Sequence, residues 1–190
     1  MTAEALIRLY YTHFNTRRLE DAASLIAPHA ALEQLLTGPQ QPGPRGYLEF
    51  AKLWLHAFPD AVFTIENISS ADGATYNVDL LSSGKHRGTL GVGGLVFRPH
   101  GADARLRLRE LLQIRQGAIV ASTLSFDLQD IIRQLVHVDS AALLSRLTRI
   151  FALAEELKLA QTHEERSREL VQRIGFELDA ARHVVRPYFK

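Results

Sequence analysis

The spacing of apolar residues changes at Pro59, and this change constrains the fold more than any other feature of the sequence. Before Pro59, apolar residues recur at helical intervals over 3–14 and 47–58, and a shorter helix is expected at 19–27. After Pro59 the period falls to two, which is typical of strands. Helices followed by a run of short strands predict an α+β domain with an antiparallel sheet.

Turn residues separate the expected strands, and Asp72-Gly73 is the clearest hairpin signal. Strands are expected over residues 62–68, 75–81, 85–90, 95–98, 105–115 and 118–126. The segment 37–46 is rich in glycine and proline, so a loop is expected there.

The sequence returns to helical spacing after the last expected strand. Asp127 is predicted to cap a helix over about 128–136. Beyond it, two apolar stripes predict a helical hairpin; they comprise Leu143, Leu147, Ile150, Ala154 and Leu157, and Leu170, Ile174, Leu178 and Val185. We therefore expect an α+β domain over residues 1–137 and a helical extension over residues 138–190.

Composition excludes several classes of function. The chain has 22 Lys and Arg against 21 Asp and Glu, so we expect no nucleic acid as a partner. It has no cysteine, which excludes disulfides, thiolate catalysis and cysteine-ligated zinc. No window approaches the ~20 apolar residues of a membrane helix, and no signal-peptide pattern is present, so we expect a cytoplasmic protein with no membrane contact.

Motif searches favour neither a metal nor a cofactor. None of the eight histidines falls in a His-x-x-x-His or His-Glu-x-x-His spacing, so no metal site is expected. There is no Walker loop, Rossmann fingerprint or Gly-x-Ser-x-Gly elbow, so we expect no cofactor.

The strand expected over 105–115 carries one acidic residue, Glu110, in phase with its apolar residues. Those apolar residues are Leu106, Leu108, Leu112 and Ile114. A buried carboxylate costs several kcal/mol unless it is neutralised, paired or in contact with water, which makes Glu110 the first candidate for a catalytic residue. Two alternatives are a bulge that turns Glu110 outward and a structural pair with an arginine.

The next strand predicts an apolar pocket, because Val120, Ser122, Leu124 and Phe126 share one face. Such a pocket suits a small apolar or aromatic molecule. The predicted lining is Trp54, Phe58, Leu108, Leu112, Ser122, Leu124 and Phe126; for the two helical residues a core role is the alternative. His86 is the second catalytic candidate, as an acid or base, and the alternative is an exposed edge histidine.

Several short motifs, taken in their order and spacing, resemble the SnoaL-like polyketide (ester) cyclases of the nuclear transport factor two-like superfamily. They are Phe14-Asn15-Thr16, Leu19-Glu20, Ala27-Pro28, Gly43-Pro44-Arg45-Gly46, Ala57-Phe58-Pro59-Asp60, Gly84-Lys85-His86-Arg87-Gly88, Ile114 with Gly117 and Ile119-Val120, and Asp127 with Arg133-Gln134-Leu135. The resemblance covers about residues 1–136. It implies a cone-shaped curved antiparallel sheet closed by N-terminal helices, and an intramolecular aldol reaction that needs no cofactor.

The resemblance also implies a changed active site. The aspartate that serves the cyclases as general acid and base falls at Leu124, and a pocket histidine of the cyclases falls at Glu110. The sequence therefore predicts a cyclase-related protein that binds a small, largely apolar molecule without the usual aspartate. One alternative is a cyclase, isomerase or hydrolase that uses Glu110 with His86; another is a non-catalytic scaffold that forms a homodimer, for example through the helical extension.

Overall fold

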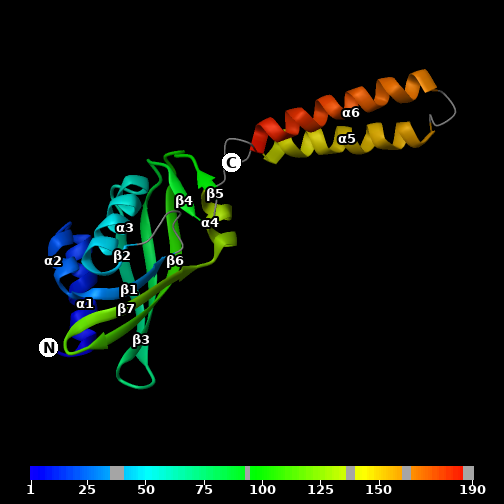
Figure 1. Cartoon of the computed structure of the whole chain (residues 1–190). Helices are drawn as coiled ribbons and strands as arrows, with labels where there is room; N and C mark the ends of the chain where they lie inside the picture. The colour runs from blue at the N-terminus through cyan, green and yellow to red at the C-terminus, as the bar shows by residue number, and fades with distance from the viewer. Residues whose placement is uncertain (35–40, 93–94, 136–139, 160–163, 186–190) are drawn as a thin grey trace. The chain divides into compact units, whose positions relative to one another are not determined.

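The chain forms two compact units, residues 1–136 and 137–190 (Figure 1). The computed structural model describes residues 1–34, 41–92, 95–135, 140–159 and 164–185. The elements of the first unit are α1 (Ala3–Asn15), α2 (Leu19–Ser24), β1 (Ile26–Gln34), α3 (Gly43–Ala57), β2 (Val62–Ser70), β3 (Thr75–Lys85), β4 (Leu90–Val92), β5 (Leu95–Phe97), β6 (Asp103–Arg115), β7 (Ala118–Phe126) and α4 (Leu128–Leu135). The second unit contains α5 (Ser140–Leu159) and α6 (Glu164–Val185).

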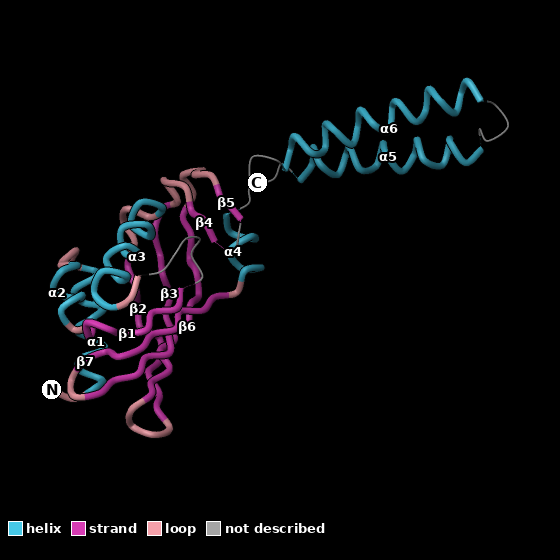
Figure 2. The backbone as a smooth tube through the Cα atoms, viewed as in Figure 1, coloured by secondary structure: helices cyan, strands magenta, loops and turns pink. Residues whose placement is uncertain are grey.

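Five strands of the first unit form one sheet in the order β1-β7-β6-β3-β2, and β4 pairs with β5. Every neighbouring pair is antiparallel except β1 with β7, which is parallel. The sheet is curved and stays open, and α1, α2 and α3 lie against it (Figure 2). The apolar stripes of α1 and α3 supply much of the core, including Ile7, Phe14 and Trp54. The predicted α+β class is confirmed.

The sequence missed β1, and the helix predicted over 19–27 is too long. α2 ends at Ser24, and the chain then enters a strand that contains Pro28. Proline is tolerated there because β1 is an edge strand of the sheet. The pairing partner of β1 is β7, about 90 residues away, which no local pattern can reveal.

Two other boundaries also differ from prediction. α3 begins at Gly43, within the segment predicted as a loop, because Pro44 lies in the first turn, where its missing N–H costs nothing; residues 37–40 of that segment lie outside the described ranges. β3 continues to Lys85, since Ser82, Ser83 and Gly84 pair with β6 instead of forming a turn. The strand predicted over 85–90 is therefore wrong.

The strand alternation that drew attention to Glu110 is confirmed. Buried and exposed side chains alternate along β6, and its pairing with β3 has no irregularity. The pairing of β6 with β7 has a bulge, which lies in β7, where Ile119 pairs with Ile114 and Ala121 pairs with Gln113. Val120 therefore falls out of phase with the inner face, contrary to prediction, and Ile119 is buried instead.

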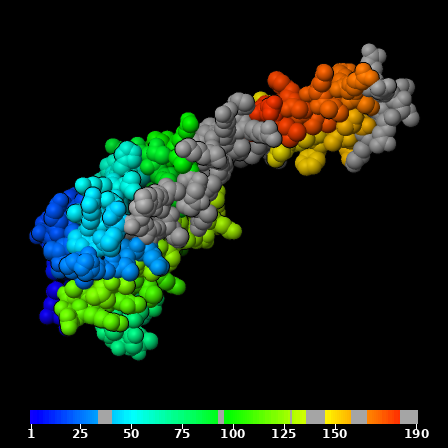
Figure 3. All heavy atoms as spheres, in the orientation of Figure 1, coloured from blue at the N-terminus to red at the C-terminus, as the bar shows by residue number. Residues whose placement is uncertain are grey.

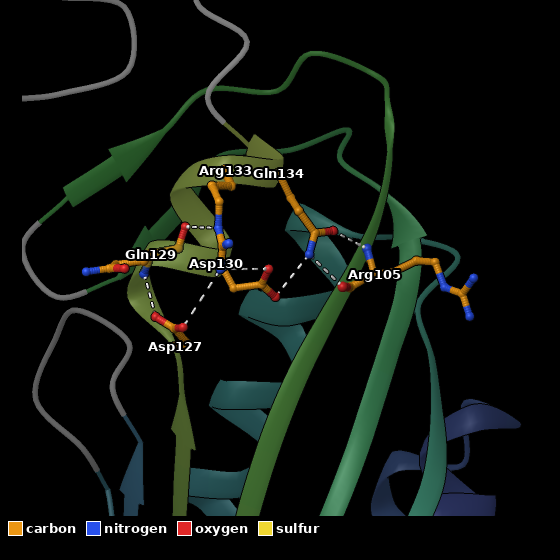
Figure 4. A network of polar contacts seen from close by, with 6 residues as sticks. All are labelled: Arg105, Asp127, Gln129, Asp130, Arg133 and Gln134. Carbon is orange, nitrogen blue, oxygen red and sulfur yellow. Dashed lines mark hydrogen bonds and ion pairs between the residues drawn. The ribbon is translucent and has the colours of Figure 1, made fainter.

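α4 is held to the sheet by a small network of polar contacts (Figure 4). The Asp127 carboxylate accepts a hydrogen bond of 2.8 Å from the backbone N–H of Gln129, which confirms the predicted cap. The side-chain amide of Gln134 accepts from the Arg105 N–H and donates to the Arg105 carbonyl, both at 2.7 Å. Gln134 thus gives the backbone N–H and carbonyl of Arg105 the hydrogen bonds that a neighbouring strand would give them.

We expect Gln134→Leu to lower the free energy of unfolding by about 1 to 3 kcal/mol, because it removes three hydrogen bonds, one to Asp130 and two that satisfy the backbone groups of Arg105. Urea denaturation measures the change. Gln129→Ala on the same helix is the matched control, since the Gln129 side chain is exposed, and it should change stability by less than about 0.5 kcal/mol. Equal effects of the two substitutions would contradict this role for Gln134.

The two helices of the second unit pack side by side (Figure 3). Leu153 and Leu170 are buried between them, with Leu157 and Ile174 packed against this pair. Arg146 donates to the Glu177 carboxylate at 2.8 Å, and Arg149 approaches the same carboxylate at 3.5 Å. Among the described residues of the whole chain, no helix has both the length and the apolar character needed to cross a membrane.

Candidate functional site

Glu110 lies on the inner face of the sheet, at the middle of three paired strands. Its neighbours in register are Val78 on β3 and Leu124 on β7. Only 5% of its surface is exposed. Of the two alternatives raised by the sequence, the bulge is absent from this part of β6, and no arginine contacts the carboxylate among the described ion pairs.

Two hydroxyl groups bind the carboxylate, one to each oxygen. The Tyr11 hydroxyl of α1 donates to Oε2, and the Ser122 hydroxyl of β7 donates to Oε1. Ser122 is paired with Leu112, two residues after Glu110 on β6, so it lies diagonally across from Glu110. The carboxylate thus connects α1 with two strands of the sheet.

Burial controls the acidity of this group. Loss of solvent raises the pKa of Glu110 above its ordinary value, while the hydrogen bonds from Ser122 and Tyr11 act in the opposite direction. The same burial, together with the nearby Glu110 charge, raises the pKa values of Tyr10, Tyr11 and Tyr47. The three phenols therefore stay protonated at neutral pH, and the hydroxyl of Tyr11 donates to Glu110.

The carboxylate borders a small aromatic cavity of about 10 Å³. Its lining is Tyr10, Tyr11, Phe14, Tyr47, Phe50, Phe63, Leu80, Glu110 and Leu124. No basic side chain belongs to this lining. The volume suffices for about one water molecule, so a larger ligand must displace lining side chains.

Tyr47 carries an unsatisfied polar group in this cavity. Its hydroxyl is fully buried and has no hydrogen-bond partner among the described residues. Its ring lies 5.2 Å from that of Tyr10. A buried hydroxyl without a partner costs about 1 to 3 kcal/mol, which a ligand acceptor at this position would recover.

The structure brings together only part of the predicted site. Leu124 lines the cavity, Ser122 binds Glu110, and Leu112 is buried beside them on β6. Leu108 and Phe126 form the next inward-facing pair along the same strands, outside the cavity lining.

The two predicted helical residues lie outside the cavity lining. Trp54 is buried and donates its indole N–H to Ser82 at 3.2 Å. The ring of Phe58 packs against His86, at 5.2 Å between centroids. Both residues therefore have the core role that the sequence left open for them.

His86 does not join Glu110. Val78 is paired with Glu110, and β3 continues from there to Lys85, about 23 Å further along the strand, before His86 is reached. His86 is neither exposed nor at the cavity; it is fully buried against Phe58 and His100. Its ring nitrogens have no hydrogen-bond partner among the described residues, and burial lowers its pKa to about 4.

The lining predicted from the sequence missed the three tyrosines and three phenylalanines of the cavity. These are Tyr10, Tyr11, Tyr47, Phe14, Phe50 and Phe63. The available signal was the pair of adjacent tyrosines on the apolar stripe of α1, because buried hydroxyls need partners. The described residues contain no group of three or more side chains placed to hold a metal ion.

Comparison with known proteins identifies the first unit. The model of the SnoaL-like polyketide cyclase family matches residues 4–135, more than half of the chain. The chain belongs to this family. We call residues 1–136 the SnoaL-like unit. No curated protein matches the chain.

Solved structures support the same fold. A SnoaL-like polyketide cyclase from Agrobacterium tumefaciens is 17% identical, with a TM-score of 0.59 over 72% of this chain and 99% of that one. TsrD from Streptomyces laurentii is also 17% identical, with a TM-score of 0.59 over 70% and 92%. A protein with a ketosteroid isomerase-like fold from Catenulispora acidiphila, in complex with trimethylamine, is 12% identical, with a TM-score of 0.57 over 71% and 94%.

Proposed function

We propose that the SnoaL-like unit binds a small, largely apolar molecule in the aromatic cavity and that Glu110 exchanges a proton with it. The register of β6 and β7 carries this proposal. Glu110 is directly opposite Leu124, the position at which the family resemblance expects an aspartate. Side chains in such a pair are about 5 Å apart at Cβ, so a carboxyl group is retained close to that position on the neighbouring strand.

The cavity supplies the other groups that a proton transfer next to a carbonyl needs. Ionised Glu110 takes a proton from the carbon beside the carbonyl, and the electron pair of that C–H bond moves toward the carbonyl oxygen. The Tyr47 hydroxyl donates a hydrogen bond to that oxygen as its charge develops. Glu110 then returns the proton to another carbon or to the same one. Burial moves the pKa of Glu110 upward, toward neutral pH. A general base is most effective when its pKa is close to the operating pH.

Tyr11 and Ser122 position the carboxylate in this mechanism. Each donates to a different oxygen, so the carboxyl plane is fixed between α1 and β7. A fixed orientation preserves reactivity in a site that must open to admit a ligand. Neither hydroxyl needs to contact the ligand for this role.

Deuterium exchange into 2-tetralone, a planar and largely apolar ketone, tests the proposal. We expect the protein to accelerate loss of the C1 proton signal in D₂O, and we expect Glu110→Gln to reduce this acceleration about 100-fold, because it abolishes ionisation. Tyr47→Phe should reduce it by a similar factor through loss of the oxyanion donor. Glu177→Gln is the control, since Glu177 is a buried carboxylate in the second unit.

The cavity volume of about 10 Å³ favours a second candidate, a structural role for the carboxylate. Glu110 would then tie α1 to the sheet through Tyr11 and Ser122, and the unit would act without chemistry at this site. In that case Tyr11→Phe lowers stability while wild type and Glu110→Gln exchange 2-tetralone at the same rate. Equal exchange rates would therefore contradict the catalytic proposal.

A further inference from the structure

The hairpin formed by α5 and α6 has an apolar face that its own packing does not use. α5 presents Leu147, Phe151 and Ala154 at i, i+4, i+7 spacing. Phe151 is 70% exposed and Leu147 is 39% exposed. On α6, Val171 and Leu178 are exposed at the same spacing around Gly175.

The opposite face of the hairpin has a different character. A groove of about 590 Å³ runs there, and five of its lining residues are charged: Arg149, Glu156, Glu169, Arg173 and Glu177. Because residues in a helix are 100° apart, Arg149 and Glu156 lie on one side of the buried seam of α5, and Leu147 and Phe151 lie on the other. The apolar face consists of Leu147, Phe151, Ala154, Val171, Gly175 and Leu178. None of these six residues is charged or belongs to the groove lining.

Gly175 is unusual because it lies in the interior of a helix of 22 residues. Glycine is the least favourable residue there apart from proline. A Cβ atom at this position would meet nothing within 4 Å, so packing within the chain as described does not require glycine. Val171, Ile174, Gly175 and Leu178 have the i, i+3, i+4, i+7 spacing of a hole that receives a side chain from a facing helix.

The register of the hairpin places a matching knob beside this hole. Arg146 and Arg149 both reach Glu177, which sets residue 151 of α5 roughly level with residue 175 of α6. When a two-fold axis parallel to the helices relates two copies, α5 of one copy packs against α6 of the other. Rotation about this axis leaves the height of each residue along the helices unchanged. Phe151 of each copy faces Gly175 of the other, so one symmetric contact fills both holes.

We propose that this face binds the same face of a second copy of the chain, forming a four-helix bundle in which Phe151 of each copy inserts over Gly175 of the other. The available area is sufficient. Helices of 20 and 22 residues are about 30 Å long and together about 20 Å wide, so this side of the hairpin, with the apolar face at its centre, offers about 600 Å² per copy. The total of about 1,200 Å² lies within the range of specific interfaces.

Sedimentation equilibrium of the full chain tests the bundle. We expect wild type to form a dimer of twice the 21.3 kDa chain mass, and we expect Phe151→Asp to raise the dimer Kd about 30-fold or more. Phe176→Asp is the matched control, because Phe176 is 71% exposed but lines the groove on the other face, and it should leave Kd unchanged. Gly175→Leu should also raise Kd, although leucine favours helix, because it fills the hole.

A crosslinking experiment tests the register without altering knob or hole. The chain contains no cysteine, so a Leu147→Cys protein and a Leu178→Cys protein can be mixed and oxidised. The proposed axis brings residue 147 of one copy near residue 178 of the other, so a disulfide between the two proteins is expected. A mixture of Leu147→Cys with Phe176→Cys should not crosslink above background.

Three outcomes overturn the proposal. One is a chain that stays monomeric at all concentrations. Another is a dimer whose Kd responds equally to Phe151→Asp and Phe176→Asp, and a third is the absence of the 147–178 crosslink in a dimer that forms. Circular dichroism of each variant separates loss of the dimer from loss of the helices, because a dissociated hairpin that keeps its helicity has lost only the interface.

Discussion

Glu110→Gln should make the protein more stable than wild type at neutral pH, and this advantage should shrink as the pH falls. Burial raises the pKa of Glu110 in the folded state. The folded protein therefore holds this proton more tightly than the unfolded chain does. The resulting stabilisation is fully present below the unfolded pKa of about 4.3 and is lost as the pH rises through the folded pKa. Each unit of difference between the two pKa values is worth about 1.4 kcal/mol.

The glutamine variant imitates the protonated acid at every pH. Its amide oxygen accepts from one of the two hydroxyls, Tyr11 or Ser122, and its NH₂ group donates to the other. Urea denaturation of both proteins between pH 4 and pH 8 measures the difference in unfolding free energy. Parallel pH dependences of wild type and variant would show that the folded state does not shift this pKa.

His86→Phe should protect the protein against acid. The pKa of His86 falls to about 4 because the ring is buried and His100 is near. Since the unfolded chain binds a proton below about pH 6.5 and the folded protein does not, stability declines as the pH falls from 6.5 toward 4. The loss approaches about 3 kcal/mol at the lower end.

Phenylalanine suits this position because the ring already packs on Phe58 and its nitrogens have no described hydrogen-bond partner. At pH 5 the variant should unfold at a clearly higher urea concentration than wild type. By pH 7 this gap between the two urea midpoints should disappear. His29→Gln serves as the control, since His29 is exposed on β1. A gap of the same size at both pH values would mean that packing, not protonation, explains the difference.

Local patterns predicted the inward-facing position of Glu110 correctly because this position depends on one strand. Alternation along β6 is a property of consecutive residues, and it placed the carboxylate on the inner face without any knowledge of the neighbouring strands. The partners of Glu110 were beyond such reasoning. Tyr11 reaches the carboxylate from a helix 99 residues earlier in the chain.

The prediction for His86 failed for a related reason. Alternation shows on which face of the sheet a residue lies. It does not show how far apart two residues on neighbouring strands are. Only the pairing of Val78 with Glu110 shows that His86 lies near the far end of β3. β1 escaped detection in the same way, because its parallel partner β7 is remote in sequence.

The parallel pairing of β1 with β7 affects how the protein is made. During synthesis, β1 has no strand partner in the sheet until β7 has also left the ribosome, because its only neighbour is nearly the last element of the SnoaL-like unit. Closing a loop of about 90 residues is entropically costly, so this step is expected to come late and slowly in folding. Until then β2, β3 and β6 can already pair beneath α1, but the inner face of the sheet lacks Ser122 and Leu124 of β7. The apolar surface left uncovered in this interval is expected to bind chaperones.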